Sequence, residues 1–185
     1  MVDDWTILKR EPVQDFGIFQ VHSKHVRSPR TGNVRKVQAI QTPDWVLVLA
    51  LTPDEEVMMV RQYRHGIEQI CLELPGGLVD SEDPSPAVAA QRELLEETGY
   101  QSPELILIGE CFPQPAVLSN GCFFFLAKDA EKIRESNLDD GEDIEIIKVP
   151  LKSILHLIET GEINHGMVLL AFSFFWLKYG QVGRA

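Results

Sequence analysis

The sequence predicts an α/β domain preceded by a short antiparallel β extension. Two observations predict this fold class. Apolar runs typical of buried strands recur between residues 45 and 128, and residues 86–98 and 151–179 have the apolar spacing of helices. Strands and helices in this order pack as layers, with helices covering a sheet. A chain of 185 residues is most simply one domain with a proper core.

The composition argues against several classes of protein. A formal net charge of −11 is the opposite of the basic surface expected of a nucleic-acid-binding protein. The longest apolar run, residues 167–177, is about half the length of a membrane span. The first residues, MVDDW, show no apolar core of a secretory signal. We therefore expect neither nucleic acid nor a membrane as a partner.

The cysteines indicate a reducing compartment. Cys71, Cys111 and Cys122 are odd in number and form no CxxC pair. This spacing predicts neither a disulfide framework nor a zinc cage, so the expected location is the cytoplasm.

Residues 1–42 are predicted to form the β extension. Residues 15–26 alternate loosely between polar and apolar, residues 28–32 are typical of a turn, and residues 34–40 return as a second strand. This pattern predicts a hairpin. Residues 43–185 are expected to form the main domain.

The main domain opens with two predicted strands. Residues 45–51 (WVLVLAL) are continuously apolar, as in a strand buried on both faces. A Thr-Pro-Asp turn follows, and residues 57–63 are expected to pair back on the first strand. The sequence Arg-Gln-Tyr-Arg at positions 61–64 is, by itself, typical of a solvated strand end.

A glycine turn and a helix come next. Residues 72–77 (LELPGG) are typical of a short strand that breaks at two glycines, where the backbone can approach a ligand closely. Ser85 is placed to cap a helix that begins at Pro86, and Gly99 is placed to end it.

The rest of the chain returns to strands and ends in helices. The predicted segments are a strand at 104–111, a proline-rich loop at 112–121, a strand at 122–128, an acidic loop at 129–143, a strand at 144–149, and helices at 151–159 and 163–179. The aromatic residues of the last helix indicate core or interface packing.

The segment 92–100 (RELLEETGY) carries the candidate chemistry. On a helix, Glu93, Glu96 and Glu97 lie at i, i+3 and i+4, so their carboxylates share one face. Apolar side chains lie roughly opposite, so the helix is expected to be buried without burying the acids. These apolar residues are Ala87, Val88, Leu94 and Leu95. Acids with this spacing either lie on a solvent-exposed helix face or bind a hard cation, and the spacing alone leaves both alternatives open.

This region resembles the signature of the Nudix hydrolase family. That signature is a glycine, five residues, a glutamate, seven residues, and then Arg-Glu-aliphatic-any-Glu-Glu-any-Gly-aliphatic. Gly77 matches the opening glycine, and residues 92–99 match the second half. The first half departs, because the spacing from the glycine to the arginine is one residue too long and Pro84 stands where the family has its glutamate. Glu82 or Asp83 is a candidate to replace that acid.

The resemblance implies an α/β/α sandwich with a mixed sheet and a divalent-metal site. The implied metal ligands are Gly76, through its carbonyl, Glu93, Glu96 and Glu97, and the implied metal is Mg²⁺, which Mn²⁺ can replace. Arg92 is implied to orient these acids and belongs, with Glu96, to the catalytic set. The implied reaction is hydrolysis of a nucleoside diphosphate linked to another group.

Further features resemble the branch of the family that acts on ADP-ribose and nucleotide sugars. The resemblance implies that Arg61 and Arg64 bind substrate, whereas Glu73 is a candidate for substrate, metal or a structural ion pair. The loop residues implied to contact substrate are Pro115, Leu118 and Ser119. A glutamate of the acidic loop is implied to activate water, and Glu142 is the candidate. Asp143 and Glu145 are the alternatives for this base.

These expectations predict an enzyme that cleaves ADP-ribose or another nucleoside diphosphate sugar to a nucleoside monophosphate and a sugar phosphate. Dinucleotides such as NADH and dinucleoside polyphosphates are alternative substrates. A non-catalytic nucleotide-sugar sensor is an alternative from another class, although the complete second half of the signature favours the enzyme. In the family, such a β extension commonly joins two subunits and forms part of the nucleotide pocket, so a homodimer is expected.

Overall fold

The computed structural model describes residues 2–138 and 141–180, and the chain divides into two compact units. The first unit comprises Met1–Pro43 and Phe112–Gly121, and the second comprises Asp44–Cys111 and Cys122–Ala185. The proline-rich loop therefore belongs with the N-terminal strands. Among the described residues, no helix is long and apolar enough to cross a membrane.

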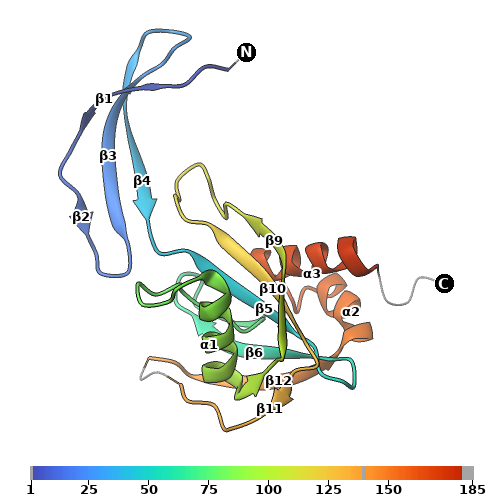
Figure 1. Cartoon of the computed structure of the whole chain (residues 1–185). Coiled ribbons are helices and arrows are strands. Elements are labelled where there is room, and N and C mark those ends of the chain that lie inside the picture. The colour runs from blue at the N-terminus through green and yellow to red at the C-terminus, as the bar shows by residue number, and fades with distance from the viewer. Residues whose placement is uncertain (1, 139–140, 181–185) are drawn as a thin grey trace. The chain divides into compact units, whose positions relative to one another are not determined.

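The first unit is an antiparallel sheet built on its longest hairpin (Figure 1). Its strands are β1 (Thr6–Arg10), β2 (Gln14–Asp15), β3 (Gln20–Arg27) and β4 (Val34–Gln41). The predicted hairpin corresponds to β3 and β4, which pair along their whole length. β1 and β2 pair with different parts of the other edge of β3. The proline-rich loop is attached at the end of β4, where the Ile40 amide donates to the Val117 carbonyl at 2.7 Å.

In its described part, the second unit contains two three-stranded sheets. The first is mixed, with β10 between β5, its parallel neighbour, and β9, its antiparallel neighbour. The second is antiparallel, with β6 between β12 and β7. The bounds are β5 (Trp45–Ala50), β6 (Glu56–Arg64), β7 (Gln69–Glu73), β9 (Glu104–Cys111), β10 (Cys122–Lys128) and β12 (Ile144–Pro150). A short ladder joins β8 (Tyr100–Gln101) to β11 (Glu131–Lys132).

The predicted pairing of the first two strands of this unit is wrong. β5 and β6 meet at an isolated bridge between Leu51 and Val57, and they belong to different sheets. The glycine turn pairs with the edge of β5 instead. There, Val46 and Gly77 exchange backbone hydrogen bonds of 2.9 and 3.1 Å. A tight turn places two strands in succession, but the hydrogen-bonding partners of each strand are chosen by the whole fold.

Two helices cover opposite faces of the mixed sheet (Figure 1). Val46 and Val48 of β5 pack in the apolar cluster of α1 (Pro86–Thr98), whereas Leu47 and Leu49 pack in that of α3 (Gly166–Tyr179). A strand buried on both faces requires this continuous apolar run. The expected α/β/α sandwich is thereby confirmed.

The described helices are α1 (Pro86–Thr98), α2 (Ile154–Glu159) and α3 (Gly166–Tyr179), with a 3-10 turn at Leu151–Ser153. The predicted helix at 151–159 therefore begins with a 3-10 turn. The last helix begins at Gly166 rather than at Ile163, which is buried in the turn before it.

Candidate active site

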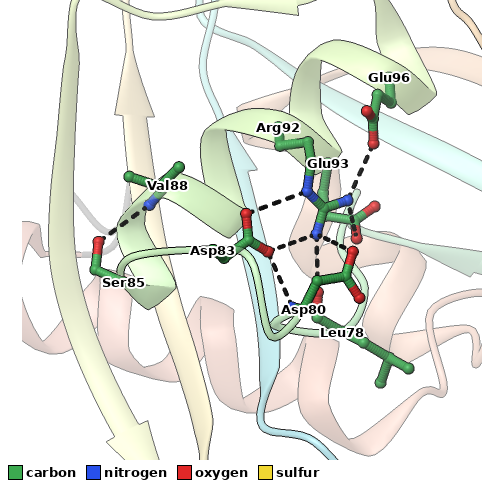
Figure 2. Close-up of polar contacts among 8 residues, drawn as sticks. All are labelled: Leu78, Asp80, Asp83, Ser85, Val88, Arg92, Glu93 and Glu96. Carbon is green, nitrogen blue, oxygen red and sulfur yellow. Dashed lines mark hydrogen bonds and ion pairs between the residues drawn. The ribbon is translucent and has the colours of Figure 1, made fainter.

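Helix α1 begins and ends at its predicted capping residues. The Ser85 backbone is extended, and its hydroxyl accepts a 3.4 Å hydrogen bond from the Val88 amide (Figure 2). Pro86 occupies the first turn, where its missing amide hydrogen costs nothing. Gly99, with φ of 75°, ends the helix and donates to the Leu95 carbonyl at 3.0 Å. The acidic segment therefore forms the last turns of α1.

Two of the three acids of α1, Glu93 and Glu97, are buried, so the prediction that the helix would be buried without burying its acids is wrong for these two. Glu93 and Glu97 are 9% and 2% exposed, whereas Val88 is 45% exposed. The glycine turn lies against this face of the helix and buries it. A Cβ atom on Gly77 would overlap Glu93 Oε1, and the Gly76 amide donates to Glu97 Oε2 at 2.9 Å.

Arg92 lies at the centre of the acidic cluster (Figure 2). Its guanidinium donates to Glu93 Oε1 at 2.9 Å, to Glu96 Oε2 at 3.0 Å and to the Leu78 carbonyl at 3.1 Å. A planar group with five donors can hold several acceptors at once. These contacts suit a side chain that orients the acids.

Of the two candidates to replace the first glutamate of the signature, Asp83 contacts Arg92. Asp83 Oδ2 accepts from Arg92 Nη2 at 2.9 Å, and Asp80 Oδ2 lies 3.4 Å from the same nitrogen (Figure 2). The hydrogen bond from Arg92 lowers the pKa of Asp83 below its usual value. Glu82 is exposed. The longer loop closes on itself, because the Asp80 amide donates to Asp83 Oδ2 at 2.9 Å.

Burial disfavours the charged form of the two buried acids of α1. Burial raises the pKa of Glu97 well above its usual range. Burial also raises the pKa of Glu93 to about 7, although Arg92 acts in the opposite direction. The charge of Glu142 raises the pKa of both glutamates, so the three carboxylates lie within electrostatic reach of one another. A cation among them would relieve this repulsion.

The carboxylates of α1 are chemically suited to a hard divalent cation, although their oxygens do not converge on a single position. Buried carboxylate oxygens that repel one another are the ligands that Mg²⁺ and Mn²⁺ prefer. Within the described ranges, no three His, Cys, Asp or Glu side chains are arranged to hold a metal. Arg92 instead holds Glu93 and Glu96. The Glu96 side chain is 36% exposed and has room to reorient.

Arg64 and Glu73 form an ion pair with two hydrogen bonds. Arg64 Nε and Nη2 lie 2.8 and 2.7 Å from the two oxygens of Glu73, which is 2% exposed. Glu73 was a candidate for contact with substrate, with metal or with a structural ion-pair partner. The contact observed with Arg64 corresponds to the structural ion pair. Glu73 is the main cause of the raised pKa of Arg64, and the charge of Glu97 contributes to it. Arg61 pairs with Glu145 at 3.3 Å on the exposed surface.

The remaining predicted site residues lie in two loops. Pro115, Leu118 and Ser119 belong to the first unit, where the Ser119 amide donates to the Ile40 carbonyl at 3.1 Å. Their contact with substrate stays a prediction. In the acidic loop, Glu142 is coupled by charge to the buried acids of α1. The loop positions 139 and 140 lie outside the described residues.

A cavity beside the glycine turn was not predicted. It has a volume of about 460 Å³, and its wall includes Gly76, Gly77 and the Arg64–Glu73 pair. The rest of the lining comes from residues as far apart in the sequence as Trp45 and Met167. No local motif could have indicated a cavity assembled in this way.

The comparison with protein families agrees with this geometry. A family model described as "NUDIX domain" matches residues 42–171, which include the glycine turn, α1 and both sheets of the second unit. The chain therefore belongs to the NUDIX family, a family of hydrolases.

The chain is also similar to individual proteins whose activities have been named. The chain is 29% identical over 178 residues to the ADP-ribose pyrophosphatase of Bacillus subtilis (strain 168), covering 96% of this chain and 95% of that protein. It is 29% identical over 131 residues to the GDP-mannose pyrophosphatase of Escherichia coli O1:K1 / APEC, covering 66% and 68%. A solved structure described as "Crystal structure of ADP compounds hydrolase" has a TM-score of 0.86 and 25% identity, covering 100% of this chain and 99% of that chain.

Proposed function

We propose that this protein is a Mg²⁺-dependent pyrophosphohydrolase that cleaves the diphosphate of ADP-ribose or of another nucleoside diphosphate sugar. Its products are a nucleoside monophosphate and a sugar phosphate. The buried, mutually repelling carboxylates of Glu93 and Glu97 beside Gly76 carry this proposal, because they suit a divalent cation. The relatives named for ADP-ribose and GDP-mannose support the substrate class.

Gly76, Glu93, Glu96 and Glu97 would hold the metal, which is Mg²⁺ or, in its place, Mn²⁺. When bound, the metal neutralises phosphate oxygens and lowers the pKa of water. Arg92 keeps Glu93 and Glu96 in position through its hydrogen bonds of 2.9 and 3.0 Å. Asp83 in turn holds the arginine.

Arg64 and Glu142 are assigned to the substrate and to the attacking water. Arg64 is anchored by the buried Glu73, yet 43% of its side chain is exposed, so it can bind a diphosphate oxygen. Glu142 is assigned as the base that takes the proton of the water, because its charge acts on both Glu93 and Glu97. Arg61 and the loop residues 115, 118 and 119 are proposed as further substrate contacts.

The proposal includes a homodimer formed through the first unit. Apolar side chains that are between 39% and 72% exposed occur along this unit: Trp5, Ile7, Leu8, Val13, Phe16, Ile18, Val34 and Val37. Exposed apolar surface of this kind marks an interaction site, and two copies can cover it symmetrically. The cytoplasm is the proposed location, and the three free cysteines support it.

The test is an assay of nucleoside monophosphate release from ADP-ribose, GDP-mannose, UDP-glucose, NADH and diadenosine tetraphosphate. We expect the fastest release from one of the nucleoside diphosphate sugars with Mg²⁺, none with EDTA, and recovery when Mg²⁺ is restored. Faster cleavage of NADH or of diadenosine tetraphosphate would change the substrate class. Tight binding of a nucleotide sugar without cleavage would identify a sensor instead.

A further inference from the structure

We propose that Cys111 and Cys122 form a reversible redox-modification site, in which an internal disulfide closes the base of the proline-rich loop. The two cysteines flank that loop, since Cys111 is the last residue of β9 and Cys122 is the first residue of β10. A low-molecular-weight disulfide is the oxidant. The proposal goes beyond the proposed diphosphatase function, because the modification requires neither the metal nor the substrate.

The strand register places the two cysteines directly opposite each other. β9 and β10 are antiparallel, and Cys111 pairs with Cys122 in their ladder. Opposite residues of an antiparallel pair project their side chains from the same face of the sheet, with Cα atoms about 4.5–5.5 Å apart. Disulfides occur at Cα separations of about 4.4–6.8 Å, so this pair can be bridged without a change of register.

The packing of the two side chains agrees with this register. Cys122 is buried in the apolar cluster on the α3 side of the mixed sheet, and Cys111 is partly buried against the same cluster. Burial raises the pKa of Cys122 to about 12, and the charge of Cys111 contributes to the rise, so the two thiols lie within electrostatic reach. Cys71 lies instead on β7, in the other three-stranded sheet, opposite Gln62.

The bond forms by two successive thiol–disulfide exchanges. Cys111 is the more accessible partner, so its sulfur loses its proton, attacks one sulfur of oxidised glutathione and releases one glutathione thiol. The buried Cys122 then loses its proton, attacks the Cys111 sulfur of the mixed disulfide and releases the second glutathione. The two cysteines lose two electrons and two protons, and the two glutathione thiols receive them.

The disulfide should stabilise the fold. The chain leaves the second unit after Cys111 and returns to it at Cys122, so the bond encloses the whole proline-rich loop. A cross-link restricts the unfolded chain, whereas the folded strands keep their register. We expect the melting temperature to rise by roughly 5 °C on oxidation. Excess reduced thiol reverses the exchange, as expected of a transient disulfide in a reducing compartment.

The test oxidises the parent protein with oxidised glutathione at alkaline pH and without divalent metal. We expect the thiol count in denaturant to fall from three to one, and the mass to fall by two hydrogen atoms with no glutathione attached. Phe112 is exposed and lies between the two cysteines. Chymotryptic cleavage after Phe112 should therefore leave two peptides that remain joined until dithiothreitol is added.

Serine variants separate this pair from the third cysteine. C111S should keep both of its thiols and show no rise in melting temperature, because the bond cannot form. C71S is the matched control, and it should lose both of its thiols and gain the same thermal stability as the parent. C122A removes a buried side chain, so if it does not fold, C111S and the peptide map of the parent decide.

Three results would overturn the proposal. The first is an oxidised parent that retains three thiols or carries glutathione on Cys111 without an internal bond. The second is a disulfide that involves Cys71 or joins two chains, which non-reducing electrophoresis would detect. The third is an equal rise in melting temperature for C111S and the parent, or no rise in a parent that contains the bond. Hydrolysis assays play no part in these readouts, so failure of the proposed function would leave them unchanged.

Discussion

Glu97 is buried to 2% exposure, and the Gly76 amide donates a hydrogen bond to its carboxylate. A buried carboxylate without a counter-charge is unfavourable unless it becomes protonated or a cation binds. Among the described residues, the charge of Arg64 lowers the pKa of Glu97, but Arg64 is already paired with Glu73. A divalent cation bound beside Glu97 would therefore stabilise the charged form of this carboxylate.

Replacing Glu97 by glutamine removes the charge and keeps the shape. We expect E97Q to lower turnover with Mg²⁺ by about 100-fold or more. The metal-free melting temperature should not fall, since glutamine can still accept from Gly76 and no buried charge remains. Mg²⁺ should raise the melting temperature of the parent and not that of E97Q. E110Q, at an exposed position, is the control, and parent-like turnover of E97Q would contradict the metal role.

Asp83 and Glu82 provide a second residue-scale test. D83N should lower kcat by roughly tenfold, because a neutral partner holds Arg92 less firmly and Glu93 and Glu96 lose their orientation. E82Q should leave kcat unchanged, because its side chain is exposed. Steady-state kinetics on the preferred nucleotide sugar compare the two variants. A larger loss in E82Q than in D83N would show that Glu82 carries the role.

The Arg64–Glu73 pair links stability to substrate binding. R64A leaves the buried Glu73 carboxylate unpaired, so it should lower the free energy of unfolding by roughly 1–3 kcal/mol, measured by urea denaturation. R64A/E73Q should recover much of that loss while KM stays raised, because the substrate contact is still absent. R61A should cost less than about 1 kcal/mol, since its pair with Glu145 is exposed. Recovery of KM in the double variant would argue against a substrate role for Arg64.

At the scale of elements, the glycine turn joins α1 to the edge of β5. Its backbone pairs with Val46, and on the other side it contacts the acids of the helix. Side chains larger than hydrogen do not fit between these layers, so the turn controls how deeply the acids are buried.

The two glycines should therefore respond differently to alanine. In Gly76→Ala the new Cβ meets the Val46 carbonyl, which is held in a backbone ladder, so we expect a loss of about 3 kcal/mol or failure to fold. In Gly77→Ala the Cβ meets the Glu93 carboxylate, which can move, so activity should fall more than stability.

Thermal unfolding and kcat measured together separate the two glycine variants. Gly166→Ala is the control, because a Cβ there meets nothing within 4 Å. Equal loss of stability in Gly76→Ala and Gly77→Ala would contradict the distinction between a fixed backbone and a mobile side chain.

At the scale of the whole molecule, the exposed apolar residues of the first unit set the expected oligomeric state. Phe16 and Ile18 are 59% and 72% exposed, and their replacement by aspartate should convert the proposed dimer to a monomer, measured by light scattering after gel filtration. I133D, at a 56% exposed site of the second unit, should leave the dimer intact. A parent protein that is already monomeric would reject the dimer.

Much of the fold and of the candidate chemistry could be predicted because the signals are local. Hydrophobic periodicity placed β9 and β10 at the residues where they occur, and caps at Ser85 and Gly99 placed α1. The spacing of Glu93, Glu96 and Glu97 indicated both a family and a kind of chemistry. These properties depend on residues within a few turns or strands of each other.

What the sequence by itself determined is thus the order of elements and the class of the enzyme. The tertiary structure decided which strands share a sheet, which face of α1 is buried, that Asp83 contacts Arg92, and that His165 and Trp45 line one cavity. The reason is that these contacts join residues far apart in the chain. Their energies depend on the packing of the whole unit, and no local pattern encodes them.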